Sequence, residues 1–441
     1  VSPYDCTGCS NCVAVCPSKE KALVMVPLDE AIKDDASNWE YAESLKETTA
    51  ELKSVNVKNS QFKKPLFEFS GACAGCGETP YVKLMTQLFG DRMLVANATG
   101  CSSIYGGSAP TCPYTKNDKG RGPAWANSLF EDNGEFGYGM HLAYQTRRGV
   151  IANKINNLLG LGGISEAMTA ALNEWLDGKD DAALSEQATD KILALIGDEK
   201  KRANGVSLEL LNDIEARKDC LIKKSVWIVG GDGWAYDIGY NGVDHVLASG
   251  EDVNILVLDT EVYSNTGGQA SKSTPTGAIA KFAATGKRTK KKDLALLAMD
   301  YGYVYVAQVS MGADMNQVVK AFAEAEAYHG PSIIIAYAPC INHGIKGGMD
   351  NSQLEMKKAV ECGYWQLFRF NPDNVGTATN PLSIDSKEPT ENYQAFLMNE
   401  NRYASLAKMN PDAAQALFAK NEEDAANKRE FYRRKAETFN K

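Results

Sequence analysis

The clearest chemical pattern in this sequence is a run of four cysteines near its beginning. Cys6, Cys9, Cys12 and Cys16 follow the spacing C-x2-C-x2-C-x3-C, and Pro17 comes directly after the last of them. Of four thiolates at this spacing, three hold one [4Fe–4S] cluster and the fourth reaches a second cluster. A zinc site would normally pair two C-x2-C knuckles that lie much farther apart. The spacing therefore predicts an iron–sulfur role.

This run is one ligand short of a full cluster, and no second run with the same spacing occurs in the 441 residues. We therefore expect the complementary cysteines upstream in a longer polypeptide or on a partner chain. The sequence opens with Val1 rather than Met. We interpret it as the carboxy-terminal part of something larger.

A Gly-rich turn forms the second chemical pattern. The letters GGDG at residues 230–233 follow an apolar stretch at 226–229 and precede a predicted helix at about 235–248. Glycines let the backbone approach a ligand, and the amino terminus of a helix favours phosphate. Asp232 adds a hard oxygen ligand of the kind that Mg²⁺ prefers. The turn therefore predicts a metal–diphosphate site.

The loop after the next predicted strand supplies Thr260, Val262 and Asn265. Both loops leave adjacent strands at the same edge of the sheet, so they can hold one metal–diphosphate. The pattern resembles the thiamine diphosphate motif, in which G-D-G is followed by Asn after about 25–30 residues. Thr260 stands where that motif usually has Asn, although its oxygen can still bind Mg²⁺ beside the Val262 carbonyl. A turn Asp followed by an ordinary strand-end loop is the alternative.

A second set of cysteines lies in Gly-, Pro- or Ser-containing loops at predicted strand or helix ends: Cys73, Cys76, Cys101 and Cys340. Backbone amides in such loops can donate hydrogen bonds to cluster sulfurs. Cys112 lies in a Pro-flanked loop and is a possible substitute ligand. For Cys220 and Cys362 we expect buried, inert thiols.

The elements that must position these residues alternate between strands and helices. Apolar segments predict strands at 93–97, 226–229, 253–258, 303–308 and 332–337, and helices are expected at 80–88, 235–248 and 315–327. This order predicts an α/β fold with a doubly wound, mostly parallel sheet that binds ligands at the carboxyl ends of its strands.

Three domains are expected along the chain. Residues 1–46 form the second half of a ferredoxin-like iron–sulfur domain, and 29–64 include a polar helix and connector. Residues 47–345 form the thiamine diphosphate- and Mg²⁺-binding α/β domain, with a helical insertion at about 150–224. Residues 346–441 form a helical extension whose tail after Cys362 is expected to pack on a neighbour.

Composition excludes several other classes of protein. The chain is 44% hydrophobic and 23% charged, with a formal net charge of −9, so it does not resemble a nucleic-acid binder. No apolar run approaches the roughly 18 residues needed to cross a bilayer, and no export signal is recognisable, so a cytoplasmic location is expected. The four scattered histidines make a multi-histidine metal site improbable.

Several long strings together resemble the carboxy-terminal portion of the pyruvate:ferredoxin (flavodoxin) oxidoreductase family. These are CAGCGETP, ATGCSSIYGGSAPTCPYT, GDGWAYDIGYNGVDHVLASGED, DTEVYSNTGGQASKSTPTG and APCINHG. With the first cysteine run they cover nearly the whole chain, except residues 150–224 and the final tail.

The resemblance implies three [4Fe–4S] clusters in the complete enzyme. It assigns to the proximal cluster Cys73, Cys76, Cys101 and Cys340. It assigns Cys6, Cys9 and Cys12 to the distal cluster and Cys16 to the medial cluster.

The resemblance also implies a thiamine diphosphate site. Its contacts would come from Glu78, Thr99, Cys101, Ile104, Gly231, Asp232, Gly233, Trp234, Thr260, Val262 and Asn265. Among these, Asp232, Thr260 and Val262 would hold Mg²⁺, and Ile104 would wedge beneath the bent cofactor. Asn265, facing the 2-oxo acid, and Cys101 would be the catalytic residues.

The implied function is oxidative decarboxylation of pyruvate with coenzyme A, giving acetyl-CoA and CO2. The clusters would pass electrons singly to ferredoxin or flavodoxin, and the chain would work with the missing amino-terminal portion of the enzyme in a homodimer. Three alternatives remain open: a sister enzyme for another 2-oxo acid, a non-catalytic electron-transfer module, and a non-redox thiamine lyase with structural clusters.

The basic run 287–292, KRTKKK, is unusual in an acidic protein. A solvated loop is the expected structure. Docking of an acidic ferredoxin or of coenzyme A phosphates is the alternative.

Overall fold

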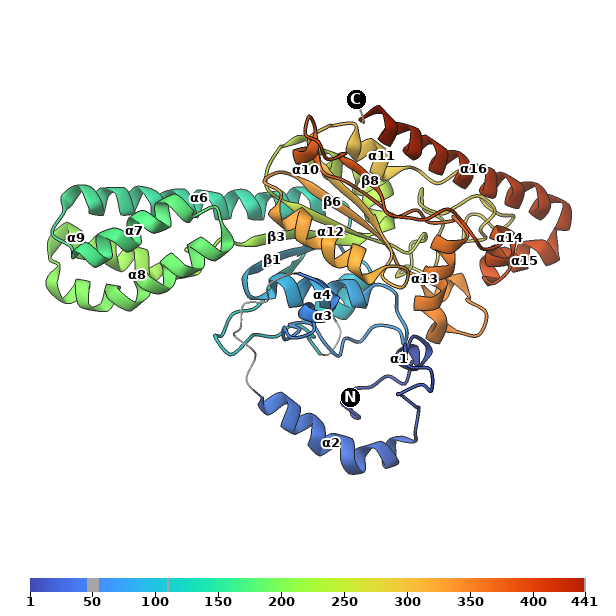
Figure 1. Ribbon diagram of the computed structural model, residues 1–441, viewed down its shortest axis with the longest axis horizontal. Helices are drawn as coiled ribbons and strands as arrows, with labels where there is room; N and C mark the ends of the chain where they lie inside the picture. The colour runs from blue at the N-terminus through green and yellow to red at the C-terminus, as the bar shows by residue number, and fades with distance from the viewer. Residues whose placement is uncertain (46–54, 109–110, 440–441) are drawn as a thin grey trace.

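The computed structural model describes residues 1–45, 55–108 and 111–439. Its centre is a sheet with the strand order β2-β1-β3-β4-β6-β5-β7-β8 (Figure 1). The strands are β1 (Met93–Asn97), β2 (Ala124–Asn127), β3 (Ser225–Gly231), β4 (Asn254–Asp259), β5 (Tyr305–Val309), β6 (Ser332–Tyr337), β7 (Phe368–Phe370) and β8 (Leu382–Ile384). The first six pair in parallel, and β7 and β8 pair antiparallel. The predicted mostly parallel α/β fold is confirmed.

Helices cover both faces of this sheet. The main ones are α4 (Thr79–Phe89), α6 (Asn133–Leu161), α10 (Tyr240–Ala248), α11 (Leu294–Met299), α12 (Met315–Ala327) and α13 (Ser352–Glu361). The strands β3 to β6 are buried along almost their whole length. Strands buried on both faces read as continuous apolar runs, which is why the sequence predicts them well.

Trp227 of β3 shows how the two faces are packed. Its ring lies between Phe89 of α4 and Phe322 of α12, with centroid separations of 5.9 and 5.4 Å. The next residue, Ile228, points to the opposite face, because successive strand side chains alternate. There Gly137 of α6 approaches so closely that a Cβ would lie 2.5 Å from Ile228 Cγ1.

Replacing Trp227 by alanine should therefore lower the free energy of unfolding by about 3–5 kcal/mol. The ring is fully buried, and its removal leaves a cavity between two helices and the sheet. Urea denaturation measures the change. Trp39→Ala is the control, because its helix α2 (Leu28–Ser44) has no buried residue, and it should cost less than about 1 kcal/mol. Equal losses in the two variants would contradict this account of the core.

The helical block predicted at 150–224 is helical and extends away from the sheet (Figure 1). It consists of the outer part of α6 with α7 (Glu166–Gly178), α8 (Ala182–Arg202) and α9 (Gly205–Ala216). These helices bury a core of their own, separate from the sheet, around Ile155, Trp175 and Ile192. Their first helix starts at Asn133, earlier than expected, and its first turns pack against β1 and β3.

The carboxy-terminal extension is not purely helical, in contrast to the expectation. It first adds β7 and β8 to the sheet and then forms α14 (Tyr393–Leu397), α15 (Asn401–Met409) and α16 (Pro411–Thr438). Phe418 and Tyr432 of α16 are buried in the main core of the same chain. The apolar side chains of this tail thus cover the sheet edge that β7 and β8 extend, and the expected packing of the tail on a neighbour stays a prediction.

The amino-terminal segment carries the first cysteine run around the short helix α1 (Asn11–Ala14), and α2 lies apart from the sheet (Figure 1). The expected domain boundary between residues 46 and 47 lies outside the described residues. Short helices α3 (Val57–Ser60) and α5 (Cys101–Ser103) complete the set. In the described part of the chain no helix is both long and apolar enough to cross a membrane.

Candidate thiamine diphosphate and cluster site

Four loops that carry predicted site residues leave one edge of the sheet. They follow β1, β3, β4 and β6, which are parallel neighbours. The register aligns Asn97 with Val229, Gly231 with Leu258, and Leu258 with Ala336. The residues after each strand therefore meet at the carboxyl edge, where parallel sheets bind their ligands.

The three predicted Mg²⁺ ligands lie together in this edge. The Oγ1 atom of Thr260 is 2.9 Å from Asp232 Oδ1 and 3.0 Å from the carbonyl oxygen of Val262. Adjacent ligands of an octahedral Mg²⁺ with bonds of about 2.1 Å lie about 3 Å apart. Ser271 donates a hydrogen bond of 2.6 Å to Asp232 Oδ2 and so fixes the carboxylate. This oxygen set fits Mg²⁺.

The charges around Asp232 also fit a cation. Burial and the charge of Asp259 raise the pKa of Asp232 well above its ordinary value. Lys291 forms an ion pair with Asp259, but among the described residues no lysine or arginine forms one with Asp232. A buried carboxylate without a cationic partner is costly. A divalent cation at Asp232 would offset that cost.

A cavity of about 170 Å³ opens beside these ligands. Among its lining residues are most of the predicted cofactor contacts: Glu78, Thr99, Cys101, Gly231, Asp232, Gly233, Trp234, Val262 and Asn265. Gly233 begins a π-helical turn (Gly233–Ile238). A Cβ at Gly233 would lie 2.6 Å from the ring of Tyr263, so the backbone can make this approach only with glycine.

A second cavity of about 150 Å³ holds all four cysteines assigned to the proximal cluster, together with Ile104 and Thr260. The two cavities share four lining residues: Glu78, Cys101, Ser264 and Asn265. The cavity beside the metal ligands therefore adjoins the cavity lined by cysteines.

Glu78 lies where the cavities meet. Its side chain is buried, and its Oε2 accepts a hydrogen bond of 2.9 Å from the hydroxyl of Tyr105. Burial raises the pKa of Glu78 to about 7, although the bond from Tyr105 acts in the opposite direction. Near neutral pH this carboxyl can therefore hold or release a proton next to a bound group.

Two thiols of the second cavity, Cys101 and Cys340, have pKa values raised above the ordinary value for a cysteine. Burial and the charge of Glu78 raise the pKa of Cys101 to about 12, and burial raises that of Cys340 to about 11. A coordinating metal deprotonates thiols outright. Within the described residues no three His, Cys, Asp or Glu side chains are close enough to hold a single metal ion.

The first cysteine run lies outside these cavities. Cys6 and Cys12 are exposed, and Cys9 and Cys16 are half-buried. Asn11, between them, donates a hydrogen bond of 3.2 Å to the carbonyl of Met349. A Cβ at Gly75, within the loop 73–76, would lie 2.4 Å from the same carbonyl oxygen, so one residue contacts both cysteine runs.

The remaining cysteines agree in part with expectation. Cys220 and Cys362 are buried, as predicted. Cys112 is exposed and lines neither cavity, and its Sγ contacts the carbonyl of Gly106 at 3.6 Å.

Sequence reasoning missed several residues that build the site. Ser264 lines both cavities and its Oγ lies 3.2 Å from Cys101 Sγ. Phe130 lines the first cavity and packs edge-on against Tyr263. Ser264 directly precedes Asn265 in the predicted loop, which was a usable signal, whereas Phe130 lies in a stretch without any motif.

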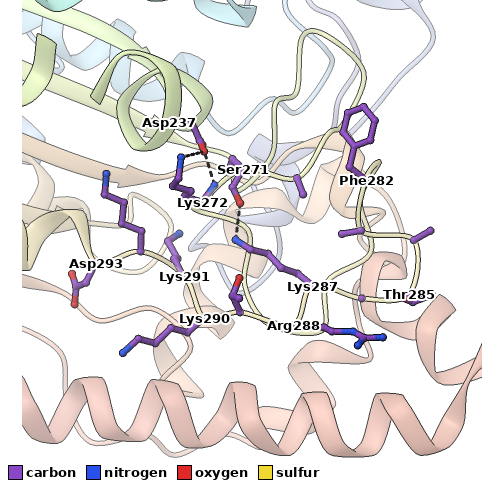
Figure 2. A pocket seen from close by; sticks show the side chains of 16 residues that line it. Asp237, Ser271, Lys272, Phe282, Thr285, Lys287, Arg288, Lys290, Lys291 and Asp293 are labelled. Atoms are coloured by element: carbon purple, nitrogen blue, oxygen red, sulfur yellow. Dashed lines mark hydrogen bonds and ion pairs between the residues drawn. The ribbon is translucent and has the colours of Figure 1, made fainter. Parts of the chain in front are cut away.

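The basic run 287–292 is only partly the solvated loop that was expected: Arg288, Thr289 and Lys290 are exposed, whereas Lys287 and Lys291 face inward. Lys287 donates hydrogen bonds of 2.6 Å to the carbonyls of Ser271 and Thr274. Figure 2 shows the first of these bonds. Lys291 contacts Asp259 at 2.8 Å and Glu261 at 2.9 Å. These lysines face inward because the loop that follows the metal ligands offers them carbonyl and carboxylate oxygens.

Glu355 of α13 gives a pH-dependent prediction. Burial and the charge of Glu400 raise its pKa to about 7. The folded chain therefore favours the protonated form, and this stabilising contribution is lost as the pH rises from about 4.5 to 7. Glu355→Gln has no charge to bury, so its free energy of unfolding relative to the parent should rise by about 2 kcal/mol between pH 5 and pH 8.

Urea denaturation at the two pH values measures this difference. Glu361→Gln on the same helix is the control, because its carboxylate forms a half-exposed ion pair with Lys357, and it should show no such rise. A pH-independent difference for Glu355→Gln would contradict the prediction.

Comparison with known proteins shows the class of protein that this chain resembles. Residues 184–336 match the family model described as thiamine pyrophosphate enzyme, C-terminal TPP binding domain. The matched segment includes Asp232, Thr260, Val262 and Asn265 but not Glu78, Cys101 or Cys340.

The similar curated proteins are pyruvate oxidoreductases. The chain is 61% identical over 437 residues to the pyruvate:ferredoxin oxidoreductase of Moorella thermoacetica, covering 99% of this chain and 37% of that protein. It is 56% identical over 436 residues to the pyruvate-flavodoxin oxidoreductase of Klebsiella pneumoniae, again covering 99% and 37%. It is 48% identical over 437 residues to the mitochondrial pyruvate dehydrogenase [NADP(+)] of Euglena gracilis, covering 99% and 24%. The resemblance to the pyruvate:ferredoxin (flavodoxin) oxidoreductases is confirmed. The chain spans 37% of the length of the Moorella and Klebsiella relatives and 24% of the length of the Euglena relative.

Proposed function

We propose that this chain forms the thiamine diphosphate-binding part of an enzyme that oxidatively decarboxylates pyruvate with coenzyme A. Its electrons leave singly through [4Fe–4S] clusters to ferredoxin or flavodoxin. The observation that carries the proposal is the adjacency of the two cavities, which share Glu78, Cys101, Ser264 and Asn265. Residues of the first cavity would hold thiamine diphosphate next to residues of the second that would hold a cluster, which supplies a one-electron acceptor when bound.

The chain's own residues hold and orient the cofactor. Asp232, Thr260 and the carbonyl of Val262 bind Mg²⁺, and the backbone from Gly231 to Trp234 receives the diphosphate at the start of a helical turn. When bound, thiamine diphosphate supplies the carbanion that attacks the 2-oxo acid and the electrons that the clusters accept.

Other residues act at the reacting end. Ile104, which lines the second cavity, would support the cofactor from that side, and Asn265, which lines both cavities, would face the 2-oxo acid. Glu78 holds a proton at its carboxyl, next to the hydroxyl of Tyr105. Cys101 is the one proposed cluster ligand that lines both cavities, so its thiolate would lie between the cluster and the cofactor.

For the clusters we propose the ligand sets that the family resemblance implies. The proximal cluster takes Cys73, Cys76, Cys101 and Cys340. The distal cluster takes Cys6, Cys9 and Cys12, and Cys16 ligates the medial cluster. The contacts of Asn11 and Gly75 with Met349 support a short path between the two regions.

We further propose the domain division at 1–46, 47–345 and 346–441, with the remaining ligands supplied by an amino-terminal portion of the same enzyme. A homodimer in the cytoplasm is the expected form. The relatives agree on pyruvate but are named with three different acceptors, ferredoxin, flavodoxin and NADP(+). The names of the relatives therefore support pyruvate as the substrate more strongly than they support any one electron acceptor.

An anaerobic assay of the intact protein tests the proposal. Pyruvate should reduce a low-potential viologen, and coenzyme A should stimulate the reaction. Reduction with another 2-oxo acid but not with pyruvate would indicate a sister enzyme. No reduction with any 2-oxo acid, with clusters shown intact, would reject the enzymatic function. Free aldehyde without reduced acceptor would indicate a non-redox lyase.

A further inference from the structure

The turn that carries the proposed Mg²⁺ ligands contains a strained residue. Glu261 lies between Thr260 and Val262 and has a φ of 59°, in the left-handed region that residues with a Cβ rarely adopt. Its backbone N–H donates to Asp259 Oδ1 at 3.1 Å, and Thr274 Oγ1 donates to its carbonyl at 2.5 Å. Strain of this kind persists only where surrounding contacts enforce it.

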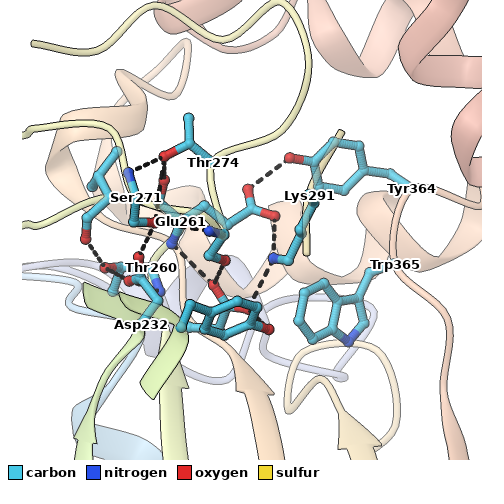
Figure 3. A network of polar contacts seen from close by, with 12 residues as sticks. Asp232, Thr260, Glu261, Ser271, Thr274, Lys291, Tyr364 and Trp365 are labelled. Atoms are coloured by element: carbon cyan, nitrogen blue, oxygen red, sulfur yellow. Dashed lines mark hydrogen bonds and ion pairs between the residues drawn. The ribbon is translucent and has the colours of Figure 1, made fainter. Parts of the chain in front are cut away.

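The side chain of Glu261 makes further contacts that hold the residue in its left-handed conformation. It is 1% exposed, and its Oε1 lies 2.9 Å from Lys291 Nζ. Its Oε2 accepts hydrogen bonds of 2.7 Å from Arg402 Nη2 and 2.6 Å from the hydroxyl of Tyr364. Figure 3 shows Lys291 and Tyr364 contacting this carboxylate. It also shows two of the proposed Mg²⁺ ligands, Thr260 and Asp232, on the other side of Glu261.

Arg402 connects this turn to the carboxy-terminal segment. It is buried at the start of α15, and its Nε donates to Glu400 Oε2 at 2.7 Å. The other oxygen of Glu400 lies 3.5 Å from His343 Nδ1, and His343 Nε2 lies 2.7 Å from the carbonyl of Thr260. The segment around 400–402 therefore contacts Glu261 through Arg402 and reaches Thr260 through His343.

We infer that Arg402 and Glu261 are positioning residues for the Mg²⁺ site, so that the carboxy-terminal segment sets the affinity for the metal–cofactor pair. This inference rests on the proposed thiamine diphosphate function. The physical reason is that Thr260 Oγ1 and the Val262 carbonyl flank Glu261 and lie 3.0 Å apart. If Glu261 relaxed from its left-handed conformation, these two oxygens would separate and the ligand set would open.

Binding of Mn²⁺ tests the inference without turnover. Mn²⁺ prefers the same oxygen ligands as Mg²⁺, and the electron paramagnetic resonance signal of free Mn²⁺ reports how much is bound. The purified protein is titrated in the presence of thiamine diphosphate. Arg402→Met should raise the half-saturating Mn²⁺ concentration at least about tenfold, and Arg402→Lys should fall between Arg402→Met and the parent.

Arg369→Met is the matched control. Arg369 of β7 is also a mostly buried arginine between two carboxylates, 2.7 Å from Glu324 and 2.9 Å from Asp385, but it does not contact the metal loop. It should lose comparable stability and keep the parent's Mn²⁺ affinity within about twofold. Tyr364→Phe removes one hydrogen bond to Glu261 without changing any charge. It should weaken Mn²⁺ binding severalfold even if Arg402→Met fails to fold.

The outcomes separate the two proposals. Parent-like Mn²⁺ affinity in Tyr364→Phe and in folded Arg402→Met would overturn the inference and leave the proposed function intact. Equal weakening in Arg369→Met and Arg402→Met would also overturn it, because the effect would then follow stability alone. A parent protein that binds no Mn²⁺ with thiamine diphosphate would reject the cofactor site itself.

Discussion

Asp232→Asn should abolish retention of Mg²⁺ and thiamine diphosphate, and with it all pyruvate-dependent reduction. Asp232 is the one charged member of the proposed oxygen set, and its Oδ1 lies 2.9 Å from Thr260 Oγ1. Removing one partner of a buried charge pair costs about 3–5 kcal/mol, which corresponds to binding at least about a hundredfold weaker. Calorimetric titration with Mg²⁺ and thiamine diphosphate measures the loss.

The same substitution should not destabilise the cofactor-free protein. In that state the buried carboxylate lies near Asp259 and its pKa is raised well above the ordinary value, so a neutral amide relieves a cost. Asp237→Asn is the control, because Asp237 forms its ion pair with the exposed Lys272, and cofactor binding should remain. Normal cofactor affinity in Asp232→Asn would contradict the assigned site.

Cys340→Ser should remove the proximal cluster while thiamine diphosphate and Mg²⁺ still bind. Cys340 lines the cysteine cavity but not the cofactor cavity, so the two sites can be uncoupled at this residue. Without an adjacent acceptor, electrons cannot leave the cofactor, and viologen reduction should fall at least about a hundredfold. Iron and thiamine contents measure the two sites separately.

Two other cysteines serve as controls for this variant. Cys362 is buried beside α13, and Cys112 is exposed outside both cavities. Cys362→Ser and Cys112→Ser should keep the full iron content. Loss of cluster iron in Cys112→Ser with full iron in Cys340→Ser would show that Cys112 is the ligand instead.

The sheet could be predicted from the sequence where its strands are buried on both faces. The segments 93–97 and 332–337 coincide with β1 and β6, and the helix 315–327 coincides with α12. The short strands β2, β7 and β8 were not predicted, because three or four residues give no periodic signal. Because β7 and β8 were not predicted, the tail was expected to consist of helices that pack on a neighbour.

The site could be predicted because its motifs have fixed spacing and follow strand ends. Every residue predicted to contact the cofactor lines one of the two adjoining cavities. The residues that hold the loop of the proposed metal ligands in place could not be predicted. Arg402 reaches Glu261 across 141 positions of sequence, and nothing local to either residue indicates this pair.

The basic run illustrates the same limit. Lys291 stands among other basic residues in the sequence, where a solvated loop is the usual structure. It is instead half-buried and forms ion pairs with Asp259 and Glu261. A single sequence shows the charge of a residue but not the distant carboxylate that will neutralise it.

The most direct test of the central claim is electron transfer from cofactor to cluster within one protein. Pyruvate is added anaerobically to the intact protein without coenzyme A or an external acceptor, and samples are frozen for electron paramagnetic resonance. The account predicts the signal of a reduced [4Fe–4S] cluster in the parent and its absence in Cys340→Ser, with thiamine diphosphate bound in both. Bound thiamine diphosphate and intact clusters that stay oxidised with every 2-oxo acid would contradict it.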